Sequence, residues 1–223
     1  MNILGFDTST RATSVCLLRD DGASFERSPT VERLFERPAH SGELLPGIEE
    51  VLREGAVDWR AIDAVAVGIG PGTFTGLRIG IATARGLAHA HALELRPVSS
   101  LAALAAGIDA SLRLPLLDAR RGELFGALYE NVTELWEPFV ATPEQLVERL
   151  REAPANAVAA GDGTLRFPEL LGAAGVTVAP RESPAHVVRA LHVCRLATET
   201  AAVPPEAVLP LYLRAPDATP KVQ

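Results

Sequence analysis

The chain has 223 residues, 48% of them hydrophobic and 22% charged, which is typical of a globular protein that buries a core in one domain or two small ones. The formal charge is −7 and Lys221 is the only lysine, so the chain is poorly equipped to bind RNA or DNA alone, because that affinity depends on neutralising phosphates. No stretch approaches the roughly 18 apolar residues of a membrane span, and MNILGFDTST lacks the features of a signal peptide, so we expect a cytoplasmic protein without membrane contact.

Hydrophobic spacing in the first half predicts three strands, a helix, a strand, a helix, a short strand and a third helix. The strands are expected at residues 3–9, 10–20, 25–33, 61–70 and 96–100. The helices are expected at residues 40–55, 75–91 and 100–110. In the first helix, Ser41 is a candidate N-cap and Gly55 is a stop signal.

The second half repeats this order more loosely. Its strands are expected at residues 113–119, 123–130, 135–141, 156–163 and 176–180. Thr142 begins TPEQ, a capping box with Pro143 at the first helical position, which predicts a helix through Arg151. A long helix is expected over residues 183–200, with Ser183 as its N-cap and Pro184 at its first position.

Two halves that each open with antiparallel strands and continue with strand–helix units predict an α/β protein with two mixed sheets flanked by helices. We place the boundary between an N-terminal subdomain, residues 1–105, and a C-terminal subdomain, residues 106–223. About the last eight residues are typical of a solvated tail. Cys16 and Cys194 lie in apolar surroundings, which favours buried free thiols over a disulfide or a cysteine metal site.

Segments spread almost end to end resemble the TsaB family, formerly YeaZ, and occur in its order: ILGFDTST, HSGELLP, AVGIGPGTFTGLRIGIATARGLA, VSSLAALA, LLDARRGELFGALYE, AAGDG and LPLYLR. The resemblance implies a duplicated actin-like ATPase fold (ASKHA, ribonuclease H-like), shared with sugar kinases and Hsp70. It also implies a role in making threonylcarbamoyladenosine (t6A) at position 37 of tRNA. In that pathway the family is a non-catalytic partner of its paralogue TsaD, with TsaE as the ATPase partner. It forms homodimers when TsaD is absent and reaches tRNA only through the complex.

Active members of the actin-like fold close two hairpins on the nucleotide phosphates, with an acidic residue near each hairpin. Asp7 and Asp118 end the first strands of the two halves and occupy the matching places, and Thr8 and Ser9 keep hydroxyls that suit phosphate oxygens. The second turn, DARRGEL, carries two arginines where active members usually have a glycine-rich anion nest. Asp7, Thr8, Ser9 and Asp118 are therefore candidates for a vestigial nucleotide site at most, and we expect no cofactor.

The two arginines of that turn, Arg120 and Arg121, could instead contact tRNA or an acidic patch of a partner, and the sequence does not choose between these roles.

The histidines do not predict a metal site. TsaD and its relatives hold a metal through an HxxxH pair on one helix face, because residues i and i+4 reach the same ion. Here His40 is solitary, His89 and His91 are two apart, and His186 and His192 are six apart. We expect no metal and favour a surface or interface position for His40, which removes the chemical basis for a metallopeptidase.

The glycines of GIGPGTFTGLRIG, residues 68–80, match neither a P-loop nor a complete GxGxxG fingerprint. Gly72, Gly76, Gly80, Ala84 and Ala88 recur every four residues and predict a groove of small side chains along the helix. A glycine inside a helix costs about 1 kcal/mol relative to alanine, so something must offset it. We favour a partner helix from another subunit, and the alternative is packing against the chain's own sheet.

The helix that begins near residue 41 is expected to lie beside this groove and to complete a docking face that serves either TsaD or a second copy. The predicted interface residues are His40, Leu44, Leu45, Ile48, Gly72, Thr73, Thr75, Gly76, Arg78, Ile79, Gly80 and Thr83.

The favoured function is thus a TsaB-type scaffold. One alternative is a stand-alone ATP-dependent kinase or ATPase of the same fold, which would bind Mg-ATP tightly and lose it on Asp7→Ala. The other is a peptidase of the glycoprotease type, which would need metal-dependent proteolysis.

Overall fold

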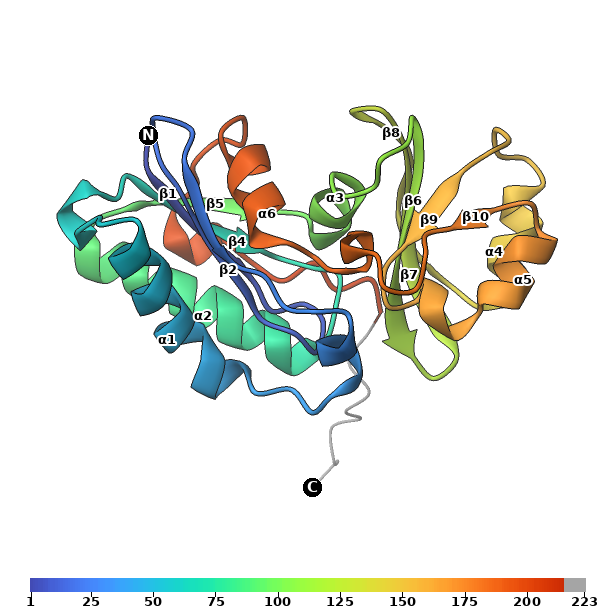
Figure 1. Ribbon diagram of the computed structural model, residues 1–223, viewed down its shortest axis with the longest axis horizontal. Coiled ribbons are helices and arrows are strands. Elements are labelled where there is room, and N and C mark those ends of the chain that lie inside the picture. Colours follow the sequence, from blue (N-terminus) through green and yellow to red (C-terminus); the bar gives the residue numbers. More distant parts are fainter. Residues whose placement is uncertain (215–223) are drawn as a thin grey trace, which may run out of the picture.

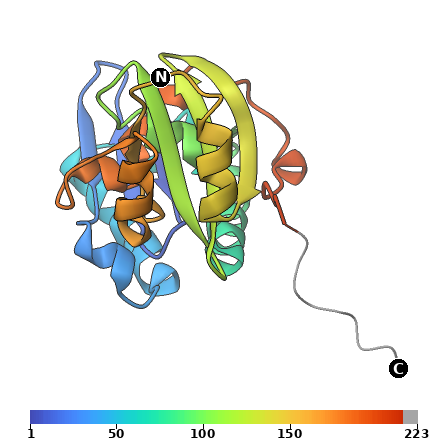
Figure 2. The same ribbon diagram turned by 90° about the vertical axis from the view of Figure 1, so that its right-hand side faces the viewer.

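In the computed structural model, which describes residues 1–214, two five-stranded sheets stand side by side with two helices between them (Figures 1 and 2). The tail expected at the end of the chain lies outside the described residues. No helix within residues 1–214 is long and apolar enough to cross a membrane.

Both sheets have the same strand order, so the predicted doublet is confirmed. The first sheet runs β3-β2-β1-β4-β5, and the second runs β8-β7-β6-β9-β10. In each, the first strand pairs antiparallel with the second and parallel with the fourth. The strands of the first sheet are β1 (Ile3–Asp7), β2 (Ser14–Leu18), β3 (Ser24–Arg27), β4 (Ala64–Gly68) and β5 (Glu94–Val98). Those of the second are β6 (Leu112–Arg120), β7 (Glu123–Glu130), β8 (Thr133–Ala141), β9 (Val158–Ala160) and β10 (Thr177–Val178).

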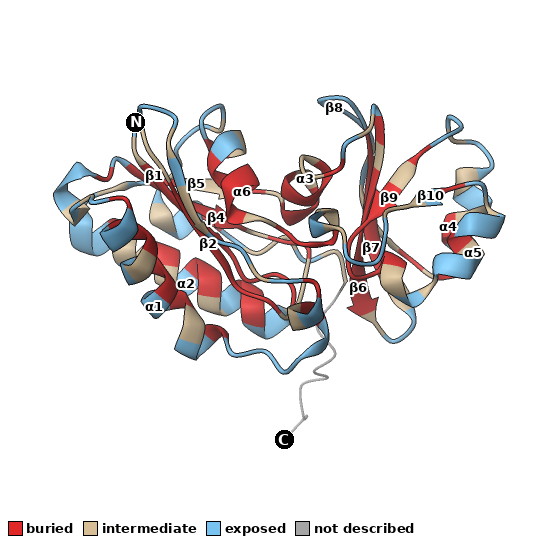
Figure 3. Cartoon of the chain, viewed as in Figure 1, coloured by how far each residue is buried: buried red, intermediate tan, exposed pale blue. Residues whose placement is uncertain are grey.

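Helices cover both faces of the sheets. The helices are α1 (His40–Glu54), α2 (Phe74–His91), α3 (Ser100–Ala105), α4 (Pro143–Leu150), α5 (Pro168–Ala173) and α6 (Ala190–Ala197). On the outer sides, α1 and α2 pack on the first sheet, and α4 and α5 pack on the second. Between the sheets, α3 contacts β6 and α6 contacts β1 and β2. Figure 3 shows these two inner helices and the strands beside them as largely buried.

One hydrophobic cluster joins the two sheets. It contains Ile3 of β1, Leu101 of α3, Leu117 of β6 and Cys194 of α6, all 2% exposed or less. The division at residue 105 stays a prediction, and α6 shows that the second half of the chain also contributes to the packing of the first sheet. Both cysteines are buried and free, as predicted.

The capping box at Thr142 is confirmed, because its side chain accepts the Gln145 N–H while the Gln145 side chain accepts the Thr142 N–H. Two other expectations are wrong. First, α1 begins at His40 and has no side-chain cap, so Ser41 lies inside the helix. Second, the long helix over residues 183–200 is broken.

The break in that helix follows from packing. A 3₁₀ turn capped by Ser183 ends at His186, and α6 begins only at Ala190. Between them the chain is extended, so Val187 and Val188 point to opposite sides and enter two different hydrophobic clusters. A helix would place neighbouring side chains only about 100° apart and could not fill both clusters.

Candidate functional site

The turn after β1 is held by its own hydrogen bonds. Asp7, which is 1% exposed, accepts from the Ser9 N–H at 2.8 Å and from the hydroxyls of Ser9 and Ser100 at 2.6 Å each. Burial raises the pKa of Asp7, and the hydrogen bonds from Ser100 and Ser9 partly oppose this rise. Both carboxylate oxygens are therefore engaged inside the chain.

The glycines of α2 allow this turn to lie against the helix. A Cβ built on Gly76 would lie 2.0 Å from the carbonyl oxygen of Thr8, and one on Gly80 would lie 2.4 Å from the Thr8 hydroxyl oxygen. A Cβ on Gly72 would lie 2.4 Å from the carbonyl oxygen of Ser9. The Thr8 hydroxyl donates to the Gly76 carbonyl at 2.8 Å. The assignment of Gly72, Gly76 and Gly80 to a partner helix is thus wrong, because their bare backbone already meets the chain's own first turn.

The turn between β6 and β7 holds a carboxylate between two guanidinium groups. Asp118, which is 8% exposed, pairs with Arg120 at 2.7 Å and with Arg166 at 2.9 Å. Arg120 and Arg121 have φ angles of 65° and 55°, so two residues with side chains adopt the left-handed conformation in this turn.

A second carboxyl group lies beneath this turn. Asp162 is 7% exposed and accepts the Asp118 N–H at 2.9 Å. Burial raises the pKa of Asp162 to about 6, and the neighbouring Asp118 charge adds to that rise. Sequence reasoning missed Asp162, although GDG directly after a buried strand placed a polar residue at the edge of the sheet.

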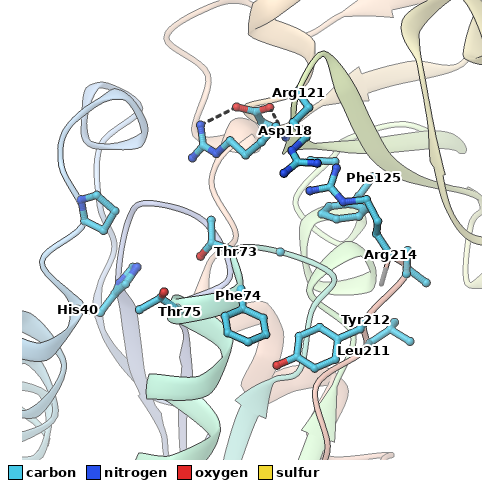
Figure 4. Close-up of a pocket in the computed structure, with 16 residues that line it drawn as sticks. His40, Thr73, Phe74, Thr75, Asp118, Arg121, Phe125, Leu211, Tyr212 and Arg214 are labelled. Atoms are coloured by element: carbon cyan, nitrogen blue, oxygen red, sulfur yellow. Dashed lines mark hydrogen bonds and ion pairs between the residues drawn. The ribbon is translucent and has the colours of Figure 1, made fainter. Parts of the chain in front are cut away.

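The second turn and the start of α2 border a cleft of about 700 Å³ between the lobes (Figure 4). One wall is formed by residues 72–76 at the start of α2 and by His40, and the other by residues 118–121 of the second turn. Residues 211–214 close one side. Of the sequence-predicted residues, the cavity lining contains His40, Gly72, Thr73, Thr75, Gly76 and Asp118. Asp7, Thr8 and Ser9 are buried and do not line it.

His40 is 3% exposed, so of the two positions expected for it the surface position is wrong, and the interface position stays a prediction. Its Nδ1 lies 2.9 Å from the Thr13 hydroxyl oxygen, which in turn donates to Glu43 at 3.0 Å. Burial acts to raise the pKa of Glu43, but hydrogen bonds from Arg33 and Thr13 outweigh it and keep that pKa lowered. Nε2 of His40 is buried and has no hydrogen-bond partner among the described residues.

The predicted interface divides between the inside and the outside of the molecule. Leu44 and Ile48 are each 1% exposed and belong to the core beneath α1, so their assignment to a docking surface is wrong. Gly76 and Gly80 are likewise buried. The remaining predicted residues are exposed or half-buried: Leu45, Thr73, Thr75, Arg78, Ile79 and Thr83.

An aromatic and arginine cluster at the start of α2 was not predicted. The rings of Phe74 and Tyr212 stack with centroids 5.5 Å apart, and Figure 4 shows them side by side. The Arg78 guanidinium carbon lies 3.8 Å from the centre of the Phe74 ring, and its Nε donates to the Tyr212 hydroxyl at 3.2 Å. Both rings remain at least 40% exposed. Of its three members only Arg78 was predicted as an interface residue, and 134 residues separate it from Tyr212.

Within residues 1–214, no three histidine, cysteine or acidic side chains lie close enough together to hold a metal ion.

Comparison with known proteins links this arrangement to tRNA modification. Residues 36–210 match the family described as "TsaD: tRNA N6-adenosine threonylcarbamoyltransferase". The "tRNA threonylcarbamoyladenosine biosynthesis protein TsaB" of Escherichia coli is 33% identical over 96% of this chain and 95% of its own length. The protein of the same name from Bacillus subtilis is 30% identical over 99% and 97%. The structure described as "YeaZ from Pseudomonas aeruginosa" has a TM-score of 0.77 at 29% identity, and the match covers 95% of this chain and 100% of that one.

Proposed function

The chain belongs to the TsaB family of tRNA threonylcarbamoyladenosine biosynthesis proteins, and from this membership we propose that it is a non-catalytic scaffold that pairs with TsaD. It takes part in t6A synthesis. TsaE is the proposed ATPase partner, and the proposed target is adenosine 37 of tRNA, which the chain reaches only through the complex. The proposed location is the cytoplasm.

The engagement of both acidic turn residues supports a non-catalytic role. Two guanidinium groups occupy the Asp118 carboxylate, and Ser9 and Ser100 occupy that of Asp7. A carboxylate that organises a metal ion or an attacking water needs an oxygen directed at the substrate. Here the chain's own donors would have to be displaced first, at a cost of several hydrogen bonds.

The observation that carries the pairing proposal is a pair of helical glycines that no contact within the chain requires. Gly42 in α1 and Gly86 in α2 are exposed, and a Cβ on either would meet no atom within 4 Å. Each costs the isolated helix about 1 kcal/mol relative to alanine. A helix of another subunit that packs closely on this side would offset that cost, since missing side chains let two backbones approach.

The outer side of α1 and α2, with these glycines, is therefore the proposed docking face. It carries Leu45, which is 52% exposed, and continues through Thr75, Arg78 and Ala82 to Gly86. The Phe74, Arg78 and Tyr212 cluster lies at one end of it, and aromatic and arginine side chains dominate the binding energy of many interfaces. A self-pairing surface must be isologous, so a homodimer would use the same face and exclude TsaD.

A matched pair of variants tests the proposal. Gly86→Arg puts a long side chain on the docking face, and Gly172→Arg makes the same change at an exposed glycine of α5, also with open space around it. Each purified variant is mixed with TsaD from the same organism, and the size of the complex and the t6A yield are measured. We expect Gly86→Arg to lose pairing and t6A formation and Gly172→Arg to keep both.

Both variants should melt close to the wild-type temperature, because neither change meets an atom of the chain. Normal pairing by Gly86→Arg would refute the docking face. Rapid ATP hydrolysis by the isolated wild-type chain, lost on Asp7→Ala, would instead favour the kinase or ATPase alternative.

A further inference from the structure

A buried nitrogen that faces the cleft has no partner within the described part of the chain. His40 is 3% exposed and lines the cavity, yet its Nε2 makes no hydrogen bond within residues 1–214. Figure 4 shows the imidazole beside Thr75 at this cavity. A buried polar atom without a partner is costly, so this nitrogen marks a place where a bound group would be favoured.

The hydrogen bonds of Thr13 decide which form of the imidazole faces the cleft. A carboxylate only accepts, so the bond from Thr13 to Glu43 uses the single hydroxyl proton of Thr13. The contact between Thr13 and His40 then requires that Nδ1 carries the proton and donates it. Burial lowers the pKa of His40, while the charges of Asp7 and Glu43 and the backbone of Thr10 act in the opposite direction, so the neutral form is favoured. In the neutral form, Nε2 is an acceptor.

The start of α2 brings donors to the same cavity. This helix has 18 residues, no acidic residue in its first turn and no side-chain cap from Thr73. The N–H groups of Phe74, Thr75 and Gly76 find no acceptor among residues 1–214. Such a helix end carries a partial positive charge and favours an anion. The hydroxyls of Thr73 and Thr75 add further donors at the cavity wall.

The opposite wall supplies further hydrogen-bond donors. Asp118 is shared by Arg120 and Arg166. Asp162, with a pKa of about 6, lies beneath them, so this wall offers guanidinium groups rather than a net positive charge. Arg120 lines the cavity, and its side chain is 38% exposed. At about 700 Å³, the cavity has the size of an ordinary small-molecule site.

We propose that this cleft binds a small anion that also carries a hydrogen-bond donor, of the class of hydrogen phosphate or the singly protonated form of a phosphate monoester. Its charged oxygens accept from the first turn of α2, and its O–H group donates to Nε2 of His40. The aromatic rings of Phe74 and Tyr212 border the cavity and leave an apolar surface for an organic group on the phosphate. This site adjoins the docking face, because both include Thr75 and the rings of Phe74 and Tyr212, but it does not rest on pairing with TsaD.

Comparing the affinities for phosphate and sulfate tests whether Nε2 of His40 takes part in binding or whether the cleft binds any anion. At pH 8 both are tetrahedral dianions, but only hydrogen phosphate has a proton to donate to a neutral imidazole. We expect calorimetric titration of the wild-type chain to show saturable phosphate binding and roughly tenfold weaker or no sulfate binding, because sulfate leaves the buried acceptor unpaired. Equal affinity for both ions, or no phosphate binding, would overturn the proposal.

Two variants assign the effect to the named groups. In His40→Asn the side-chain amide replaces Nδ1 toward Thr13 and nothing replaces Nε2, so phosphate affinity should fall to that of sulfate. Thr75→Glu places a carboxylate in the first turn of α2, which suits the helix end and should leave the melting temperature unchanged or higher. It should weaken binding of phosphate at least tenfold by repulsion. Wild-type phosphate binding by either variant would contradict the assignment.

Discussion

The same substitution at two positions of α2 should change stability in opposite directions. Gly76 and Gly86 both lie inside this helix. At Gly86 a methyl group would meet no atom within 4 Å, whereas at Gly76 it would lie 2.0 Å from the Thr8 carbonyl oxygen. Alanine is the better helix former at both positions, so any difference between the two variants reports the surroundings of the methyl group.

The magnitudes follow from these surroundings. Gly86→Ala should stabilise the chain by about 1 kcal/mol, which raises the melting temperature of a chain of this size by roughly 2 to 4 °C. Gly76→Ala forces two backbone segments apart, at a cost of about 3 kcal/mol. It also weakens the hydrogen bond from Thr8 to the Gly76 carbonyl, worth about 1 kcal/mol. With the propensity gain subtracted, the net loss is about 3 kcal/mol, or roughly 6 to 12 °C.

Thermal melting and urea denaturation of the isolated chain measure both changes. The pairing assay with TsaD provides a second readout, in which Gly86→Ala should still pair because a methyl group is small. If both variants gained stability, the close contact between α2 and the first turn would be wrong, and the glycines at 76 and 80 would again be free to meet a partner.

The remaining predictions concern charge and the docking face. Burial raises the pKa of Asp162 from 3.8 to about 6, so the folded chain favours the protonated carboxyl group and loses stability as pH rises through that range. Asp162→Asn should remove this pH dependence. At pH 7 it should add at most about 3 kcal/mol to the free energy of unfolding. Burial, assisted by the Arg189 charge, lowers the pKa of His192 from 6.5 to about 4, so the folded chain loses stability as pH falls between these values. His192→Gln should make the free energy of unfolding, measured by urea denaturation, nearly independent of pH in this range. Tyr212→Ala should weaken TsaD pairing roughly tenfold, measured by titration, with little change in melting temperature because Tyr212 is 40% exposed.

The order of the strands was predictable because its signals are local, although the short helix α5 (Pro168–Ala173) was missed. Alternating apolar residues gave the strands of both halves, and the capping box at Thr142 fixed the start of α4. Each of these signals depends on residues a few positions apart. The order of elements then limited the sheets to a repeated mixed arrangement, which the strand pairing confirms.

The burial of particular side chains was not predictable, because it depends on residues distant in sequence. His40 was expected at the surface or in an interface, but it is buried beside Thr13, which lies 27 residues earlier in the chain, just before β2. The break before α6 depends on two hydrophobic clusters that Val187 and Val188 fill from opposite sides. The long apolar pattern of residues 183–200 is equally consistent with an unbroken helix, so local sequence alone could not reveal it.

The glycines of α2 show why spacing alone could not identify the docking face. A repeat of small residues every four positions indicates only that one face of the helix is bare, and a neighbouring turn of the same chain can use that face as well as a partner can. The contacts of an added Cβ separate the two cases: a Cβ on Gly76 or Gly80 would collide with the chain's own first turn, and a Cβ on Gly86 would meet no atom.

The same reasoning supports the cleft proposal, because Nε2 of His40 is a buried acceptor for which the described chain supplies no donor. Both proposals therefore begin from a feature that costs the isolated molecule free energy, and each assigns to a bound group the interaction that would offset it.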